Sequence, residues 1–169
     1  YHPRHRLVLA GRGAIFRSMA QIGKAIGFDL HLLSPDEQDL AAAAPLADAD
    51  PIHLTSPHRD IALDMLDGHS AFLTLFHDHD WEPMLLRAAL QSPARFIGSL
   101  GSRRTHNMRR ETLRGLGVPD SALARLHGPI GLVPSLRDAP SIAVSTLAEI
   151  VAGFRADEAN PHAAPLCHP

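Results

Sequence analysis

Short apolar runs alternate along this chain with longer segments in which apolar residues recur every three or four positions. The clearest run, residues 71–76, is apolar at almost every position, as expected for a strand that is covered on both faces of a sheet. Strands are predicted over residues 6–10, 28–33, 52–54, 71–76 and 95–97. Helices are predicted over residues 14–26, 35–44, 57–66, 81–90, 103–115, 119–127 and 142–154.

Capping residues set several of the predicted helix boundaries. Ser34-Pro35-Asp36-Glu37 has the form of a capping box with proline at the first helical position. Ser56 and Asp80 are predicted to cap the next two helices, and Ser102 the helix after them. Gly128-Pro129-Ile130-Gly131-Leu132 has several residues with special backbone requirements, which predicts a rigid, irregular turn.

The alternation of strands and helices predicts an α/β fold. We expect a Rossmann-like, doubly wound, mostly parallel sheet with helices on both faces. Residues 1–156 form the predicted domain, and the proline- and alanine-rich residues 157–169 are predicted to be a flexible tail. The first residue is Tyr1 rather than methionine, which suggests a trimmed form or a fragment of a longer polypeptide.

Three segments are predicted to meet where the parallel strands end. They are Gly11-Arg12-Gly13, His77-Asp78-His79 and Gly101-Ser102-Arg103-Arg104. Open α/β sheets bind their ligands at the carboxyl ends of the strands, so these segments are the candidate binding residues.

The third segment places two cations where a helix disfavours them. Arg103 and Arg104 fall in the first turn of the predicted helix, beside free backbone N–H groups and the positive end of the helix dipole. A phosphate there would gain from the N–H groups, the dipole and the guanidinium groups together. The alternative is a solvated basic helix end, and the residues alone do not decide between the two.

The first segment begins like the fingerprint of a dinucleotide-binding loop but does not complete it. Phe16 stands where the third glycine should allow close packing of helix and strand. Ser34 stands about where an acidic residue should bind a ribose hydroxyl. A complete NAD(P) site is therefore not favoured, whereas a phosphate on Gly13 at the helix N-terminus remains open.

The second segment can be interpreted in three ways. His77, Asp78 and His79 could supply a general base, a carboxylate partner or two metal ligands. A strand-end turn in which Asp78 and Asp80 compete to cap the next helix explains them equally well. We favour that turn over a metal site because no third ligand is near in the sequence, and we keep ligand binding as a candidate role.

Composition excludes some compartments and partners. The chain has 169 residues, 45% of them hydrophobic, and no apolar stretch of about 18 residues that could span a bilayer. No secretory leader is recognisable, and Cys167 is the single cysteine, which together predict a cytoplasmic protein without disulfides.

The formal net charge of −2 conceals a separation of charge along the chain. Arg59 is the only lysine or arginine between residues 35 and 82, a strongly acidic stretch, whereas residues 83–115 and the first thirty residues are basic. If the two basic segments meet in space, they form a positive mouth suited to a phosphorylated small molecule. Nucleic acid is not expected, because the net charge is negative and aromatic residues are few.

Four blocks in a fixed order resemble one protein family. They are Thr74-Leu75-Phe76-His77-Asp78-His79, Phe96-Ile97-Gly98-Ser99-Leu100-Gly101-Ser102-Arg103-Arg104, Leu126-His127-Gly128-Pro129-Ile130-Gly131-Leu132 and Ile142-Ala143-Val144-Ser145-Thr146-Leu147-Ala148-Glu149-Ile150. Together they are similar to the C-terminal Rossmann domain of the XdhC/CoxI family, the accessory proteins of xanthine dehydrogenase and carbon monoxide dehydrogenase. The small cysteine-bearing N-terminal domain of that family is absent from this sequence.

The resemblance implies a carrier rather than a catalyst. It implies that the chain binds molybdenum cofactor, as molybdopterin or its dinucleotide form, and assists its sulfuration with a cysteine desulfurase. It also implies delivery to an apo-molybdoenzyme of the xanthine oxidase type. The expected cofactor-binding residues are Gly11, Gly13, His77, Asp78, His79, Gly101, Ser102, Arg103 and Arg104. A homodimer is left open.

Two other functions remain as alternatives. The first is an NAD(P)-dependent oxidoreductase, with the nucleotide over Gly11-Arg12-Gly13 and His77 or His79 as the acid–base group. The second is a degenerate Rossmann domain that only pairs with a partner protein.

Overall fold

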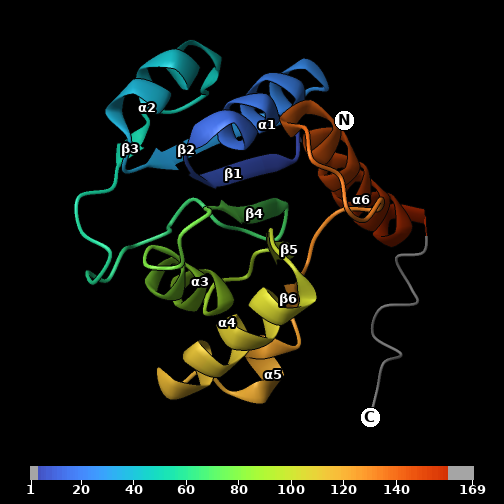
Figure 1. Cartoon of the computed structure of the whole chain (residues 1–169). Coiled ribbons are helices and arrows are strands. Elements are labelled where there is room, and N and C mark those ends of the chain that lie inside the picture. The colour runs from blue at the N-terminus through green and yellow to red at the C-terminus, as the bar shows by residue number, and fades with distance from the viewer. Residues whose placement is uncertain (1–3, 160–169) are drawn as a thin grey trace.

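All six strands of the sheet run parallel, in the order β3-β2-β1-β4-β5-β6. The computed structural model describes residues 4–159 (Figure 1). The strands are β1 (Arg6–Gly11), β2 (Asp29–Ser34), β3 (Ile52–His53), β4 (Ser70–Leu75), β5 (Phe96–Ser99) and β6 (Leu126–His127). The helices are α1 (Gly13–Ala25), α2 (Glu37–Ala43), the 3₁₀ turn η1 (Ala44–Leu46), α3 (Glu82–Leu90), α4 (Arg103–Gly115), α5 (Asp120–Leu123) and α6 (Ala139–Ala159). This arrangement confirms the predicted α/β Rossmann-like fold.

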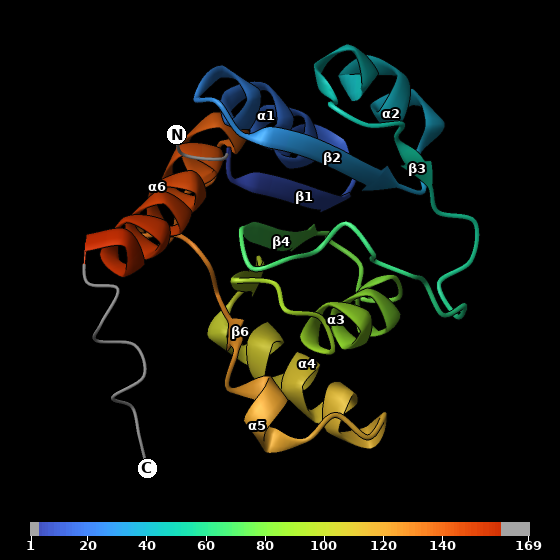
Figure 2. The same ribbon diagram turned by 180° about the vertical axis from the view of Figure 1, so that it is seen from behind.

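The helices form one layer on each side of the sheet. Figures 1 and 2 show α1, α2 and α6 on one face and α3, α4 and α5 on the other. Side chains of β1 alternate between these layers, because successive residues of a strand point to opposite faces. Leu7 and Leu9 pack in the cluster under α1 and α6, whereas Val8 and Ala10 pack in the cluster over α3. The strand order reverses between β1 and β4, and this switch point is where such folds place a ligand.

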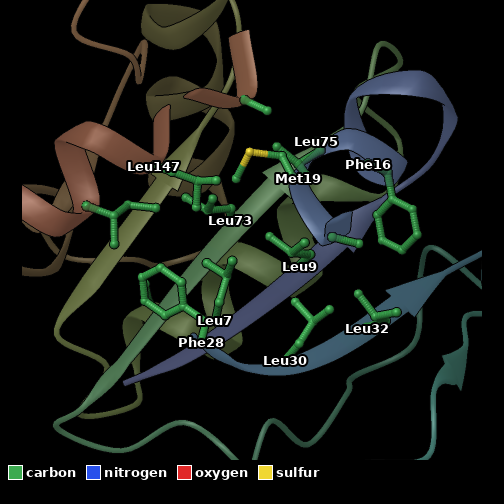
Figure 3. Close-up of a cluster of buried hydrophobic side chains, with 14 of the residues drawn as sticks. Leu7, Leu9, Phe16, Met19, Phe28, Leu30, Leu32, Leu73, Leu75 and Leu147 are labelled. Carbon is green, nitrogen blue, oxygen red and sulfur yellow. The ribbon is translucent and has the colours of Figure 1, made fainter. Parts of the chain in front are cut away.

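The core on the α1 side consists of closely packed aliphatic and aromatic side chains. Figure 3 shows leucines of the central strands meeting Phe16 and Met19 of α1 and Leu147 of α6. Phe16 and Met19 are fully buried, and each such side chain contributes about 1.5–3 kcal/mol to folding. Phe16 is therefore a core residue.

One predicted helix is wrong. Residues 57–66 form turns and loop rather than a helix. The buried leucines of this loop are Leu63 and Leu66, whereas Ile61 is only partly buried, so burial does not follow the predicted helical face. Arg6 Nη1 donates to the Met65 carbonyl oxygen at 2.7 Å, which connects this loop to β1.

Several boundaries also differ from the predictions. The cap of α2 is Asp36, which accepts from the N–H groups of Gln38 and Asp39, and Ser34 belongs to β2 instead. The residue at the cap position of α3 is Trp81, with no side-chain bond, rather than Asp80. The predicted 119–127 helix is shorter, and the pairing of β6 with β5 accounts for its last residues.

The last helix, α6, is longer at its C-terminal end than the sequence predicts. α6 continues to Ala159, so the tail predicted from residue 157 begins inside it, and residues 160–169 lie outside the described part. Within residues 4–159, none of the helices has the length and apolar content needed to cross a membrane.

Candidate functional site

A cavity of about 1000 Å³ opens at the carboxyl ends of β4 and β5. Its walls come from the turn after β4, the turn after β5, the segment from Gly128 to Leu136, and α6. The predicted binding residues that line it are His77, His79, Gly101, Ser102 and Arg103. Gly11, Gly13, Asp78 and Arg104 are not among the lining residues.

The start of α4 faces this cavity. Gly101 has a φ of 136°, which makes the sharp turn out of β5 accessible to glycine and strained for other residues. Ser102 then caps the helix as predicted, because its Oγ accepts from the Thr105 N–H at 3.1 Å. The first turn of α4 contains no acidic residue.

Arg103 and Arg104 keep their guanidinium groups free of protein partners. Both side chains are exposed, and neither makes a hydrogen bond or ion pair within residues 4–159. Only Arg103 lines the cavity. The N-terminal end of α4 therefore combines a capped helix end with Arg103 at the cavity, and Arg104 is the next residue.

Arg109, on the same helix, does not contribute to a positive mouth. Its guanidinium is buried and bonds Glu82 of α3 through Nε–Oε2 at 2.5 Å and Nη2–Oε1 at 3.3 Å. Nη2 also donates to the Leu100 carbonyl at 2.7 Å. This bonding fixes the turn after β5 to α3 and α4, so Arg109 positions the cavity wall.

The basic residues near the N-terminus are likewise neutralised by carboxylates. Arg4 and Lys24 contact Asp48, and Arg6 contacts Asp29. Arg12 contacts Asp78, and Arg17 contacts Asp39. The charge separation seen along the sequence becomes a set of ion pairs in the fold, and the broad positive mouth is reduced to the end of α4.

His77 and His79 face the cavity, whereas Asp78 points toward β1. His79 Nδ1 lies 3.7 Å from Glu82 Oε1, which joins it to the buried Arg109 pair. Asp78 forms an ion pair with Arg12, while its Oδ1 is buried without a hydrogen-bond partner. No group of three or more metal-ligating side chains occurs within residues 4–159.

In the first glycine loop, the Asp39 carboxylate occupies the position where a phosphate would bind. The Gly13 N–H donates to Asp39 Oδ2 at 2.7 Å, and Arg17 binds the other oxygen of that carboxylate. A Cβ at Gly11 would lie 2.5 Å from the Leu75 carbonyl oxygen, so this glycine permits close packing of β1 and β4. Both glycines thus have structural explanations, and the phosphate position on Gly13 is already filled.

The sequence did not reveal that α6 and the segment before it form a wall of the cavity. Ile130 N donates to the Ser99 carbonyl at 3.2 Å, and Gly131 N donates to Glu149 at 2.9 Å. Val133 N donates to Ser145 Oγ at 2.8 Å. The glycines and proline of this segment were the signal that its conformation is fixed, but not that it borders a site.

Thr146 is the most unusual residue of that wall. It is fully buried, lines the cavity, and its Oγ1 has no hydrogen-bond partner in the described structure. Buried hydroxyl groups are almost always satisfied, so an unpaired one beside a cavity is a candidate for ligand contact.

The His106 ring packs against Gly128, in the segment that forms the same wall. Burial, aided by Arg109 and Arg110, lowers the pKa of His106 from 6.5 to about 4, so the ring is neutral at pH 7. A Cβ at Gly128 would lie 2.0 Å from its Nδ1, so only glycine lets the segment approach this ring.

Comparison with known proteins identifies one family. Residues 7–150 match the model of the XdhC Rossmann domain. The molybdenum cofactor insertion chaperone PaoD of Escherichia coli (strain K12) is 30% identical over 150 residues, covering 89% of this chain and 40% of that protein. The uncharacterized protein YqeB of the same strain is 30% identical over 148 residues, covering 88% of this chain and 27% of that protein. The chain thus spans less than half the length of either relative.

A solved structure supports the same fold. It is the crystal structure of a Bacillus halodurans protein described as a xanthine dehydrogenase, with a TM-score of 0.74 and 23% identity. The match covers 100% of this chain and 50% of that one.

Proposed function

The chain belongs to the XdhC Rossmann-domain family, and from that premise we propose that it binds molybdenum cofactor in the cavity at the ends of β4 and β5. The proposed role is that of a maturation factor, which holds the cofactor for insertion into a molybdoenzyme. The name of the relative PaoD, a molybdenum cofactor insertion chaperone, supports this role.

The observation that carries the proposal is the N-terminal end of α4. Ser102 caps a helix whose first turn has no acidic residue, and Arg103 lines the cavity without a partner among residues 4–159. A phosphate of molybdopterin would accept hydrogen bonds from the helix N–H groups and from the Arg103 guanidinium. It would neutralise the conflict between two arginines and the helix dipole.

The remaining walls fit the organic part of such a ligand. A volume of about 1000 Å³ is at the upper end of the range for small-molecule and cofactor sites. Ser145 and Thr146 place hydroxyl groups on the α6 wall, and His77 lies on the wall after β4. A pterin ring carries donors and acceptors around its edge, so an unpaired buried hydroxyl suits it.

When bound, the molybdenum cofactor supplies redox chemistry to the enzyme that receives it. The role of this chain is to bind the cofactor, orient it and limit its contact with water. The described residues contain no cysteine, because Cys167 lies outside them. We further propose that a cysteine desulfurase supplies sulfur for the cofactor, and that the recipient is an apo-enzyme of the xanthine oxidase type.

Cofactor retention tests this function. The protein is co-expressed with a recipient molybdoenzyme, and its pterin is oxidised to a fluorescent product and quantified. We expect Arg103→Ala to retain at least about tenfold less pterin, because it removes a charge-assisted contact worth about 1.5–3 kcal/mol. Arg104→Ala should lose less, since that residue does not line the cavity.

Arg155→Ala is the matched control, because Arg155 is an exposed arginine on α6 outside the cavity. Retention by Arg103→Ala equal to that of this control would contradict the proposed site. It would favour the alternative in which the domain only pairs with a partner protein.

A further inference from the structure

We propose that Asp39 is a built-in anion that keeps the phosphates of dinucleotides out of the first glycine loop. In Rossmann folds of this strand order, a pyrophosphate binds the N-terminus of the helix after β1. Here the Asp39 carboxylate occupies that position. Asp39 is thus a specificity-determining residue. It prevents NAD(P) from binding at the first glycine loop and leaves only the β4–β5 side of the sheet open to ligands.

The contacts of Asp39 are those that a bound phosphate would make. Oδ2 accepts from the Gly13 N–H at 2.7 Å, at the first residue of α1, and Oδ1 pairs with Arg17 on the next turn. The Asp39 side chain is only 7% exposed. A negative group held at this position satisfies both the free N–H and the positive end of the α1 dipole.

Within residues 4–159, the N-terminus of α1 is not capped by a side chain of its own. Arg12 at its cap position makes no side-chain cap bond, and the first turn contains no acidic residue. The anion comes instead from α2, where the Asp36 cap accepts from the Asp39 N–H at 3.0 Å. The cap therefore fixes the backbone of Asp39 and holds its carboxylate against Gly13.

Neighbouring groups close the rest of the dinucleotide position. Ser34, at the end of β2, is fully buried, and its Oγ accepts from the Asp36 N–H at 3.1 Å. No carboxylate stands there to receive a ribose. Arg12 contacts Asp78, which ties the turn after β1 to the turn after β4. A phosphate entering this loop would meet a nearly buried carboxylate of the same charge.

Pyrophosphate and NAD⁺ are suitable probes, titrated calorimetrically into the full chain. Arg103→Ala serves as the background, so that binding at the N-terminal end of α4 is weakened in every variant compared. In that background we expect Asp39→Ser to bind pyrophosphate at least about tenfold more tightly than the parent, because it frees the Gly13 N–H and Arg17. Adding Arg17→Ala should abolish the gain. Glu37→Gln, an exposed change on the same helix, should produce none.

Asp39→Asn provides a second route, because it keeps an acceptor for Gly13 and loses only the charge. A gain in either folded variant supports the proposal. It is overturned if neither folded variant binds pyrophosphate better than the parent, or if the parent itself binds NAD⁺ and Arg12→Ala removes that binding. These outcomes are independent of molybdenum cofactor retention by the wild type.

Discussion

Glu82 on α3 and Arg109 on α4 face each other with both side chains almost fully buried, at 2% and 4% exposure. Their two contacts lie directly behind the turn that ends in Ser102 and Arg103, since Arg109 also holds the Leu100 carbonyl. The shape of the proposed phosphate site thus depends on an ion pair that a ligand does not touch.

Removing one partner of this pair should be strongly destabilising. We expect Arg109→Ala to lower the free energy of unfolding by about 3–5 kcal/mol, because Glu82 would remain as an uncompensated buried charge. The double variant Glu82→Leu with Arg109→Met should recover most of that loss. Chemical denaturation monitored by circular dichroism measures both. A double variant as unstable as Arg109→Ala would contradict the cost assigned to an uncompensated buried Glu82.

Two buried threonines should respond in opposite ways to the same substitution. Thr74 Oγ1 is 2.5 Å from Ser99 Oγ, so Thr74→Val should cost about 1–3 kcal/mol by leaving Ser99 unpaired. Thr146→Val removes a hydroxyl that has no partner in the described part of the chain, so the apo-protein should be unchanged or slightly more stable. Thermal unfolding of the two variants checks this.

The same Thr146 substitution should weaken cofactor retention while stability is preserved. The reason is that a ligand in the cavity would lose its hydrogen bond to Oγ1. Retained pterin, measured as above, is the readout. A Thr146→Val protein as unstable as Thr74→Val would mean that the hydroxyl has a structural role instead.

His106 should make stability depend on pH in the acidic range. Its folded pKa is about 4 against an ordinary value of 6.5, so between these values the unfolded chain binds the proton and the folded chain does not. Its contribution is therefore complete above pH 6.5 and is lost as the pH falls from 6.5 toward 4. The slope for one proton is at most about 1.4 kcal/mol per pH unit.

A His106→Asn variant tests the assignment, since asparagine does not titrate. Urea unfolding of both proteins at several values between pH 4 and 7 should give a shallower pH dependence for the variant. Identical slopes would assign the acid sensitivity to other groups.

Features that depend on residues close together in the chain could be predicted from the sequence. The alternation of apolar runs with helical spacing specified the α/β class, because burial on both sheet faces and along one helix face repeats with fixed periods. Ser102 was recognised as a cap because the bond that it accepts comes from Thr105, three residues away. The family blocks were also visible in the sequence alone.

Which charged side chains remain unpaired could be seen only in the folded structure. Arg109 and Arg103 lie on the same helix. Arg109 is buried in an ion pair with Glu82, which is 27 residues away in the sequence, whereas Arg103 has no partner within residues 4–159. Asp39 fills the loop at Gly13 across 26 residues for the same reason. Ion pairs and cavity walls depend on which elements the fold brings together, and local periodicity carries no information about those distances.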